Sequence, residues 1–235
     1  PLNVKMNKEG YEDIADVLDR GTTALNPEEF ELAANETEAL MLDVRHQKDF
    51  VQEHIPRSIF IGLNGDFAPW VGALIADTQQ PLLLNIPEGQ EEEAITRLSR
   101  VGFDGTIGYL KGGLEAWKAA GKETDSITSI SALEAKEKLA SKSIGVFDVR
   151  KESEYLSEHV ESAENTPLSE LNGHLAKFPE KEDFLVHCAG GYRSVIAASI
   201  LKSRGIHNLL DVAGGFGALK KEGVEETDYV CPTTL

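Results

Sequence analysis

Cys188 and its neighbours are the residues of this sequence whose types and spacing could do covalent chemistry. Cys188 follows a short apolar run at 184–187, and a small loop with Gly190 and Gly191 separates it from a helical pattern that begins at Arg193. Paired glycines let successive backbone N–H groups turn inward around one point, and the helix directs its unpaired N–H groups to the same point. Such surroundings lower the pKa of a thiol and stabilise the thiolate, which is the nucleophile. The pattern therefore predicts a nucleophilic cysteine.

The elements that must position this loop are expected to alternate between strands and helices. Residues 144–149 and 184–187 are too short and too apolar for helices and fit buried strands, and 208–212 fit another strand. Residues 130–142 and 193–204 carry helical patterns. This alternation predicts an α/β fold with a parallel sheet and helices on both faces, in which ligands bind beyond the C-terminal ends of the strands.

The chain contains an internal repeat. Leu-Asp-Val-Arg at 42–45 returns as Phe-Asp-Val-Arg at 147–150, and the glycine pair at 112–113 returns at 214–215. A repeat of about 100 residues is too long for a solenoid unit and suits a duplicated domain. The expected parts of the chain are a lead-in segment over 1–24, a first domain over 25–123 and a second domain over 124–235.

Composition narrows the function classes. The net charge of -17, from 40 acidic and 23 basic residues, disfavours binding to nucleic acid or to an anionic membrane. The two cysteines, Cys188 and Cys231, cannot form a disulfide framework or a four-ligand zinc site, and the 6 histidines lack HxxxH or HxH spacing. We therefore expect no metal and no cofactor, and a reducing, cytoplasmic setting. Cys231 is expected to be an ordinary thiol; the alternative is that it resolves a disulfide with Cys188.

The arrangement resembles the rhodanese family, and the resemblance covers both repeats. The matching elements are Asp148-Val149-Arg150, Glu158-His159-Val160 followed by Ala163 and Asn165, the loop 188–193, and Gly214-Gly215. The resemblance implies two rhodanese-like domains and a sulfurtransferase, in which Cys188 takes sulfane sulfur from a persulfide or thiosulfate, carries it as a persulfide and passes it to a thiophilic acceptor such as sulfite or a thiol. Arg193 would bind the anionic donor, and Asp148 and Arg150 would be structural charges under the site. The residues implied to surround the persulfide with N–H groups are Ala189, Gly190, Gly191 and Tyr192.

Two other function classes remain open. A cysteine-based phosphatase or arsenate reductase would use the same fold, but those sites have the longer spacing C-x-x-x-x-x-R, because a tetrahedral oxyanion needs more room. The loop from Cys188 to Arg193 has the spacing C-x-x-x-x-R, which favours sulfur transfer. The third class is a non-catalytic interaction module.

The first repeat is expected to be catalytically inactive. In the alignment of the two repeats Asn85 takes the place of Cys188, and Gln90 takes that of the loop arginine. Pro87 removes one N–H group from the loop, and the acidic run at 91–93 would repel an anion. The non-catalytic module is therefore the best description of this repeat.

The lead-in resembles the junction between a metallo-β-lactamase-fold domain and a rhodanese tail, as in bacterial persulfide dioxygenase–sulfurtransferase fusions. The resemblance rests on residues 3–12, followed by Leu18, Arg20-Gly21 and Leu25. It implies an upstream, iron-holding metallo-β-lactamase-fold domain in the same polypeptide. Within the present chain the segment is expected to be a helical lead-in that packs on the first domain.

Overall fold

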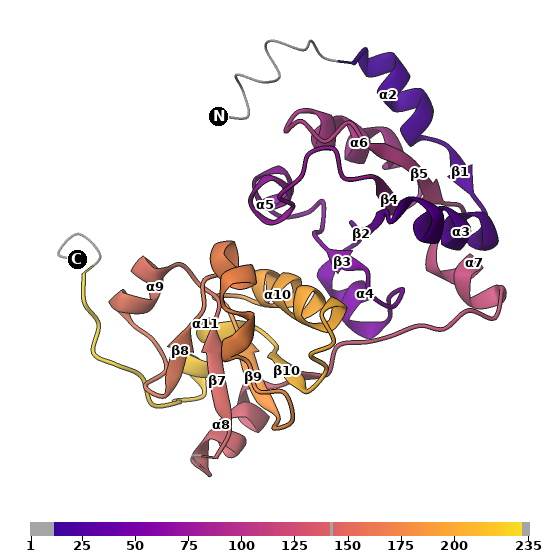
Figure 1. Cartoon of the computed structure of the whole chain (residues 1–235). Coiled ribbons are helices and arrows are strands. Elements are labelled where there is room, and N and C mark those ends of the chain that lie inside the picture. The colour runs from indigo at the N-terminus through magenta and orange to yellow at the C-terminus, as the bar shows by residue number, and fades with distance from the viewer. Residues whose placement is uncertain (1–11, 142, 232–235) are drawn as a thin grey trace. The chain divides into compact units, whose positions relative to one another are not determined.

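The computed structural model describes residues 12–141 and 143–231 and contains two five-stranded sheets (Figure 1). The described chain forms two compact units. One comprises the residues up to Arg45 together with Ile61–Glu123, and the other comprises His46–Phe60 together with the residues from Thr124 onward. The domain limits inferred from the repeat, 25–123 and 124–235, stay a prediction.

The two sheets have the same strand order. The first is ordered β1-β5-β4-β2-β3 and the second β6-β10-β9-β7-β8, with parallel pairing between neighbours. The strands of the first sheet are β1 (Ala24–Leu25), β2 (Leu40–Asp43), β3 (Ile59–Phe60), β4 (Leu82–Asn85) and β5 (Thr106–Leu110). Those of the second are β6 (Ser129–Ile130), β7 (Gly145–Asp148), β8 (Ala163–Asn165), β9 (Phe184–His187) and β10 (Leu209–Val212). The predicted α/β fold with two parallel sheets is confirmed.

Six of the described helices lie in the lead-in and the first repeat. They are α2 (Ile14–Gly21), α3 (Pro27–Thr37), α4 (Gln47–Gln52), α5 (Phe67–Leu74), α6 (Glu91–Ser99) and α7 (Gly113–Ala119). Helix α2 lies in the lead-in and packs on α6 and β5, and the Arg20 guanidinium donates to the carbonyl oxygens of Asp104 and Thr106. Most of the residues that suggest a metallo-β-lactamase junction precede residue 12 and lie outside the described residues, so that interpretation stays a prediction.

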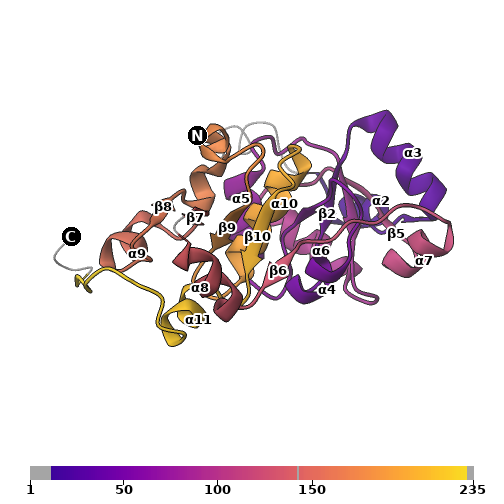
Figure 2. The ribbon, with the colours of Figure 1, turned by 90° about the horizontal axis from the view of Figure 1, so that it is seen from below.

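Helices cover both faces of the second sheet. They are α8 (Ala132–Ala140), α9 (Glu152–Ser157), α10 (Tyr192–Ser203) and α11 (Gly215–Lys221), with two 3-10 turns, η1 (Leu168–Gly173) and η2 (Leu175–Lys177). On one face α8 and α11 share a core with Val146, Leu185 and Val212. Helix α10 packs on β9 and β10 from the other face (Figure 2). Because side chains alternate along a strand, residues next to those three point toward α10.

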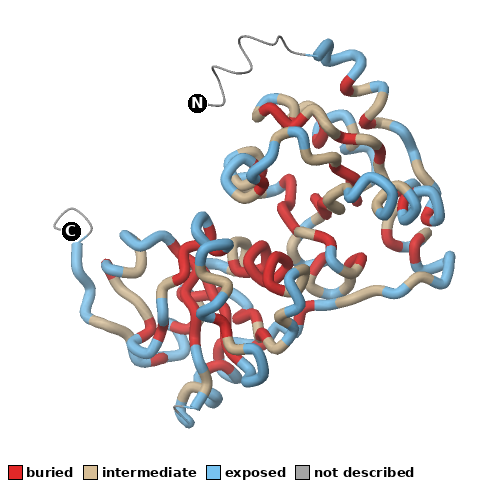
Figure 3. The backbone as a smooth tube through the Cα atoms, in the orientation of Figure 1, coloured by how far each residue is buried: buried red, intermediate tan, exposed pale blue. Residues whose placement is uncertain are grey.

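Burial explains why β9 and α10 form here. All four residues of β9 are buried, and α10 is buried continuously from Ser194 to Leu201 (Figure 3). A short run of bulky apolar residues suits a central strand covered on both faces.

None of the helices in the described ranges has the length and apolar character needed to span a membrane.

Candidate active site

The thiol of Cys188 lies where β9 ends and α10 begins. Cys188 is only 1 % exposed. Gly191 has a φ of 101°, in the left-handed region that glycine adopts without strain, and its backbone N–H donates to Cys188 Sγ at 3.1 Å. The thiol reaches the hydroxyl oxygen of Ser194 at 3.6 Å. The loop therefore brings a backbone donor and a hydroxyl group to one buried sulfur.

Three other loop residues were predicted to direct N–H groups at the sulfur, namely Ala189, Gly190 and Tyr192. The carbonyl of Ala189 accepts a hydrogen bond from Gly217 N–H at 3.2 Å. Gly190 is exposed, and the ring of Tyr192 packs edge-on against Phe60 with the ring centroids 5.7 Å apart. That the N–H groups of these residues bind a persulfide stays a prediction.

Helix α11 forms two backbone hydrogen bonds with the cysteine loop. Phe216 N–H donates to the carbonyl of Cys188 at 2.7 Å, next to the bond from α11 to Ala189. This approach needs a glycine, because a Cβ at Gly215 would lie 2.3 Å from the carbonyl oxygen of Cys188, and the φ of Gly215 is +56°. The second glycine of the Gly214-Gly215 pair therefore serves the loop as well as the helix start.

Arg193 is engaged in an ion pair. Its two terminal nitrogens donate to the carboxylate of Glu154 at 2.6 and 2.9 Å. The hydrogen bond from the guanidinium lowers the pKa of Glu154, and the carboxylate raises the pKa of Arg193. The cation predicted to bind a donor anion thus already has an anionic partner in α9.

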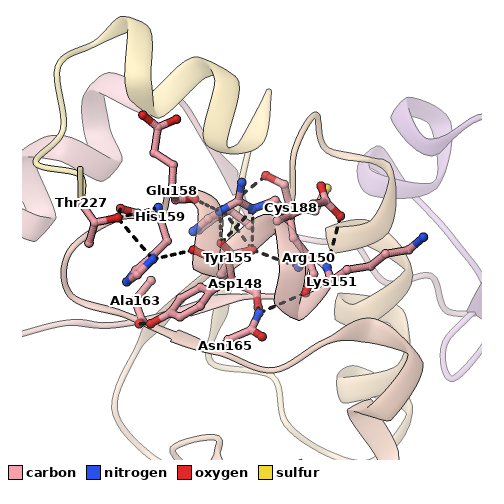
Figure 4. Close-up of polar contacts among 12 residues, drawn as sticks. Asp148, Arg150, Lys151, Tyr155, Glu158, His159, Ala163, Asn165, Cys188 and Thr227 are labelled. Atoms are coloured by element: carbon pink, nitrogen blue, oxygen red, sulfur yellow. Dashed lines mark hydrogen bonds and ion pairs between the residues drawn. The ribbon is translucent and has the colours of Figure 1, made fainter. Parts of the chain in front are cut away.

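Asp148 and Arg150 form a second, buried ion pair at the end of β7. The guanidinium binds both carboxylate oxygens, with Nη2 at 2.6 Å from Oδ2. Arg150 also donates to the carbonyl of Glu158 at 2.8 Å (Figure 4). Its guanidinium carbon lies 4.1 Å from the centroid of the Phe216 ring. Asn165 donates to the carbonyl of Asp148 at 2.8 Å. The pair connects the end of β7 to α9, β8 and α11.

The two histidines nearest the site are held in place by neighbouring groups. His187 is buried, its Nδ1 lies 3.3 Å from the carbonyl of Cys188, and burial lowers its pKa, which keeps the ring uncharged near pH 7. His159 stacks on Tyr155 with centroids 3.7 Å apart, and its Nδ1 lies 2.7 Å from the Tyr155 carbonyl.

The strand register corrects the alignment of the two repeats by one residue. Asp43 pairs with Asn85 in the first sheet as Asp148 pairs with His187 in the second. Asn85 therefore corresponds to His187, and Ile86 corresponds to Cys188. The alignment that put Asn85 opposite the cysteine was wrong, because it followed apolar runs and ignored strand pairing. An isoleucine at the loop start is no more nucleophilic than an asparagine, so an inactive first repeat stays the prediction.

The first repeat nevertheless keeps the buried charge pair. Arg45 binds Asp43 with Nη2 at 2.7 Å from Oδ2, and Asn85 donates to the same oxygen at 2.8 Å. The first turn of α6 contains the acidic run Glu91, Glu92 and Glu93. The pair thus occurs in both repeats, and its predicted role as structural charges stays a prediction.

Two residues at the site were not predicted to act there. The position of Ser194 in the first turn of the helix after the cysteine loop could have identified it as a site residue. Glu154 was harder to identify. It lies in the first turn of the helix after β7, and the C-terminal ends of parallel strands meet at one edge of the sheet. Its contact with Arg193 depends on β7 lying beside β9, which a single sequence does not give. Among the described residues, no three His, Cys, Asp or Glu side chains gather as a metal site.

The chain is similar to one family model, to curated proteins and to solved structures. The model of the Rhodanese-like domain matches residues 26–120 and 131–222. Thiosulfate sulfurtransferase GlpE of Coxiella burnetii is 31% identical over 91 residues, which cover 39% of this chain and 85% of GlpE. YrkF of Bacillus subtilis is 30% identical over 95 residues, 40% of this chain, and the match spans about half of YrkF, 51%. A solved rhodanese-like domain protein from Staphylococcus aureus is 33% identical, with 42% of this chain and 97% of that chain covered and a TM-score of 0.39.

Proposed function

The chain belongs to the rhodanese-like family in both repeats, and we propose from that premise that its second repeat is a sulfurtransferase with Cys188 as the nucleophile. The observation that carries the proposal is the buried Cys188 sulfur, which accepts the Gly191 N–H at 3.1 Å in front of the α10 N-terminus. A backbone donor and a helix N-terminus both stabilise a thiolate.

The proposed reaction has two steps. The Cys188 thiolate attacks the outer sulfur of the donor, a bond forms between Sγ and that sulfur, and the donor's own S–S bond breaks with its electron pair on the leaving group. The persulfide on Cys188 then yields its outer sulfur to an acceptor nucleophile, and Cys188 leaves as a thiolate. The spacing C-x-x-x-x-R favours this chemistry over phosphate or arsenate chemistry.

The test is the mass of the intact protein before and after incubation with a small alkyl persulfide or thiosulfate. We expect one adduct of about 32 Da, the mass of one sulfur atom, located on Cys188 by peptide mapping and removed by cyanide. An adduct confined to Cys231, or no adduct with either donor, contradicts the proposal.

The Arg193–Glu154 pair supports a preference for donors of low charge. A dianion such as thiosulfate would approach a guanidinium that is already neutralised, on a chain of net charge -17. We propose that a persulfide of a small thiol is the better donor.

Substituting Glu154→Gln should therefore change donor preference. It removes the negative charge beside Arg193 and leaves the guanidinium to bind an anion, so kcat/KM for thiosulfate should rise about tenfold relative to that for the alkyl persulfide. Arg193→Ala is the matched control and should lower use of thiosulfate more than use of the persulfide. If Glu154→Gln lowers kcat/KM equally for both donors, the pair holds the shape of the loop and does not set specificity.

A further inference from the structure

Asp211 is a buried carboxylic acid with no part in the chemistry described so far. Its residue is 2 % exposed. Oδ2 accepts a hydrogen bond from the Ser129 hydroxyl at 3.1 Å, and Oδ1 has no hydrogen-bond partner among the described residues. A buried carboxyl group without full hydrogen bonding is costly to the folded state, and such a group calls for an explanation.

Asp211 lies on the face of the sheet that carries the Cys188 thiol. It is the register partner of Val186 in β9, two residues before Cys188, so the side chains of Asp211 and Cys188 are directed toward α10. The first turn of α10 places Ser194, fully buried, against both groups. Ser194 Oγ lies 3.6 Å from Cys188 Sγ, and its hydroxyl is close enough to the Asp211 side chain to lower the pKa of that carboxyl group. The order of contacts is thiol, hydroxyl, carboxyl.

We propose that Ser194 and Asp211 form a proton relay for Cys188. The thiol proton passes to Ser194 Oγ while the hydroxyl proton of Ser194 passes to the Asp211 carboxylate, so that the S–H bond breaks and Cys188 becomes a thiolate. The proton stays on Asp211 while the persulfide exists. When the acceptor takes the outer sulfur, Cys188 leaves with the electron pair and recovers the proton by the same route. The relay rests on the proposed role of Cys188; Ser194 touches the reacting sulfur, and Asp211 acts through Ser194 as a positioning residue.

The acidity of Asp211 suits this role. Burial raises its pKa from 3.8 to about 6, against the hydrogen bonds from Ser194 and Ser129. A free thiol has a pKa of about 8.5, so an ordinary carboxylate would be too weak a base, and the buried one is a better match. Among the described residues no charged side chain shifts this pKa by charge–charge interaction. Among the other titratable groups of the site, His187 lies 4.0 Å from Asp148, and Arg193 is paired with Glu154.

Comparison with the first repeat indicates that the fold does not need the Asp211 carboxyl group. By the corrected register the counterparts of Cys188, Ser194 and Asp211 are Ile86, Glu92 and Tyr109. The same strand order forms with a tyrosine at the Asp211 position. All three groups of the relay are therefore missing together from the repeat that lacks the nucleophile.

The test is the pH dependence of Cys188 alkylation by iodoacetamide, in full-length chain carrying Cys231→Ser so that one thiol reacts. With the relay, Asp211 can accept the proton only above about pH 6, where it is ionised. The rate should rise to an inflection near pH 6 and change less than about threefold from pH 6.5 to 7.5. In Asp211→Asn the inflection should vanish, and the rate should change about tenfold per pH unit, as for an isolated thiol below its pKa.

Two further variants separate the relay from a structural effect. Ser194→Ala breaks the route and should give the profile of Asp211→Asn, with no additional change in the double variant. Ser129→Ala removes a hydrogen bond that lowers the pKa of Asp211 but leaves the route intact, so the inflection should persist at higher pH. Parallel profiles for the wild type and Ser194→Ala would overturn the relay even if Asp211→Asn failed to fold. Alkylation needs no sulfur donor, so it tests the relay separately from the proposed function. If the inflection near pH 6 is present but Cys188 forms no persulfide, the proposed function is contradicted and the relay is not.

Discussion

Cys188→Ser should reduce sulfur transfer by at least about 10³-fold and leave the fold unchanged. Serine has nearly the same shape as cysteine, and its hydroxyl can keep the contacts with Gly191 N–H and the Ser194 hydroxyl. A hydroxyl group, however, is a far weaker nucleophile than a thiolate at neutral pH and cannot carry sulfane sulfur. The measurement is steady-state transfer from an alkyl persulfide to cyanide, together with thermal unfolding of the variant.

Cys231→Ser is the matched control, because Cys231 is exposed and Cys188 is buried. It should retain most of the activity and the same unfolding midpoint. Loss of turnover in Cys231→Ser with retention in Cys188→Ser would show that the nucleophile was assigned to the wrong residue.

The strands around Cys188 could be predicted from the sequence because they are short, apolar and buried. The run predicted at 184–187 is β9 without change, and the one predicted at 144–149 is β7 at Gly145–Asp148. The helix predicted at 130–142 is α8 at Ala132–Ala140, and its first predicted residue, Ile130, belongs to the two-residue strand β6. A strand this short leaves no alternation to detect, and only its pairing with β10 defines it.

The contacts that set the chemistry could not be read in the same way. The sequence predicts a cation at Arg193, but it does not show that Glu154 of α9 forms an ion pair with it. Asp211 stands within the apolar strand β10, and its acidity depends on its burial in the folded chain. The one-residue error between the repeats has the same origin, since strand pairing, not residue similarity, fixes register. Local patterns thus locate the candidate nucleophile, and tertiary packing decides what surrounds it.

Gly215→Ala should destabilise the protein by about 3–5 kcal/mol and lower sulfur transfer about 100-fold in the molecules that remain folded. The added Cβ would lie 2.3 Å from the carbonyl oxygen of Cys188 and 2.9 Å from the carbonyl carbon of Ala189, at a φ of +56°. Relief requires α11 to move away from the cysteine loop, which breaks the hydrogen bond from Phe216 to the Cys188 carbonyl. The sulfur would then lose its alignment with the Gly191 N–H.

The first repeat supplies the control for this prediction. Gly113 is the counterpart of Gly215 and has nearly the same φ, +58°, but a Cβ there would meet only Asn85 Oδ1, at an ordinary 3.7 Å. Gly113→Ala should therefore show the left-handed backbone penalty alone, about 1–2 kcal/mol, with unchanged activity. Urea unfolding and persulfide transfer of the two variants compare the same substitution with and without contact to the cysteine loop. Equal losses of stability and activity would mean that the backbone conformation, and not the close approach of α11 to Cys188, is what Gly215 provides.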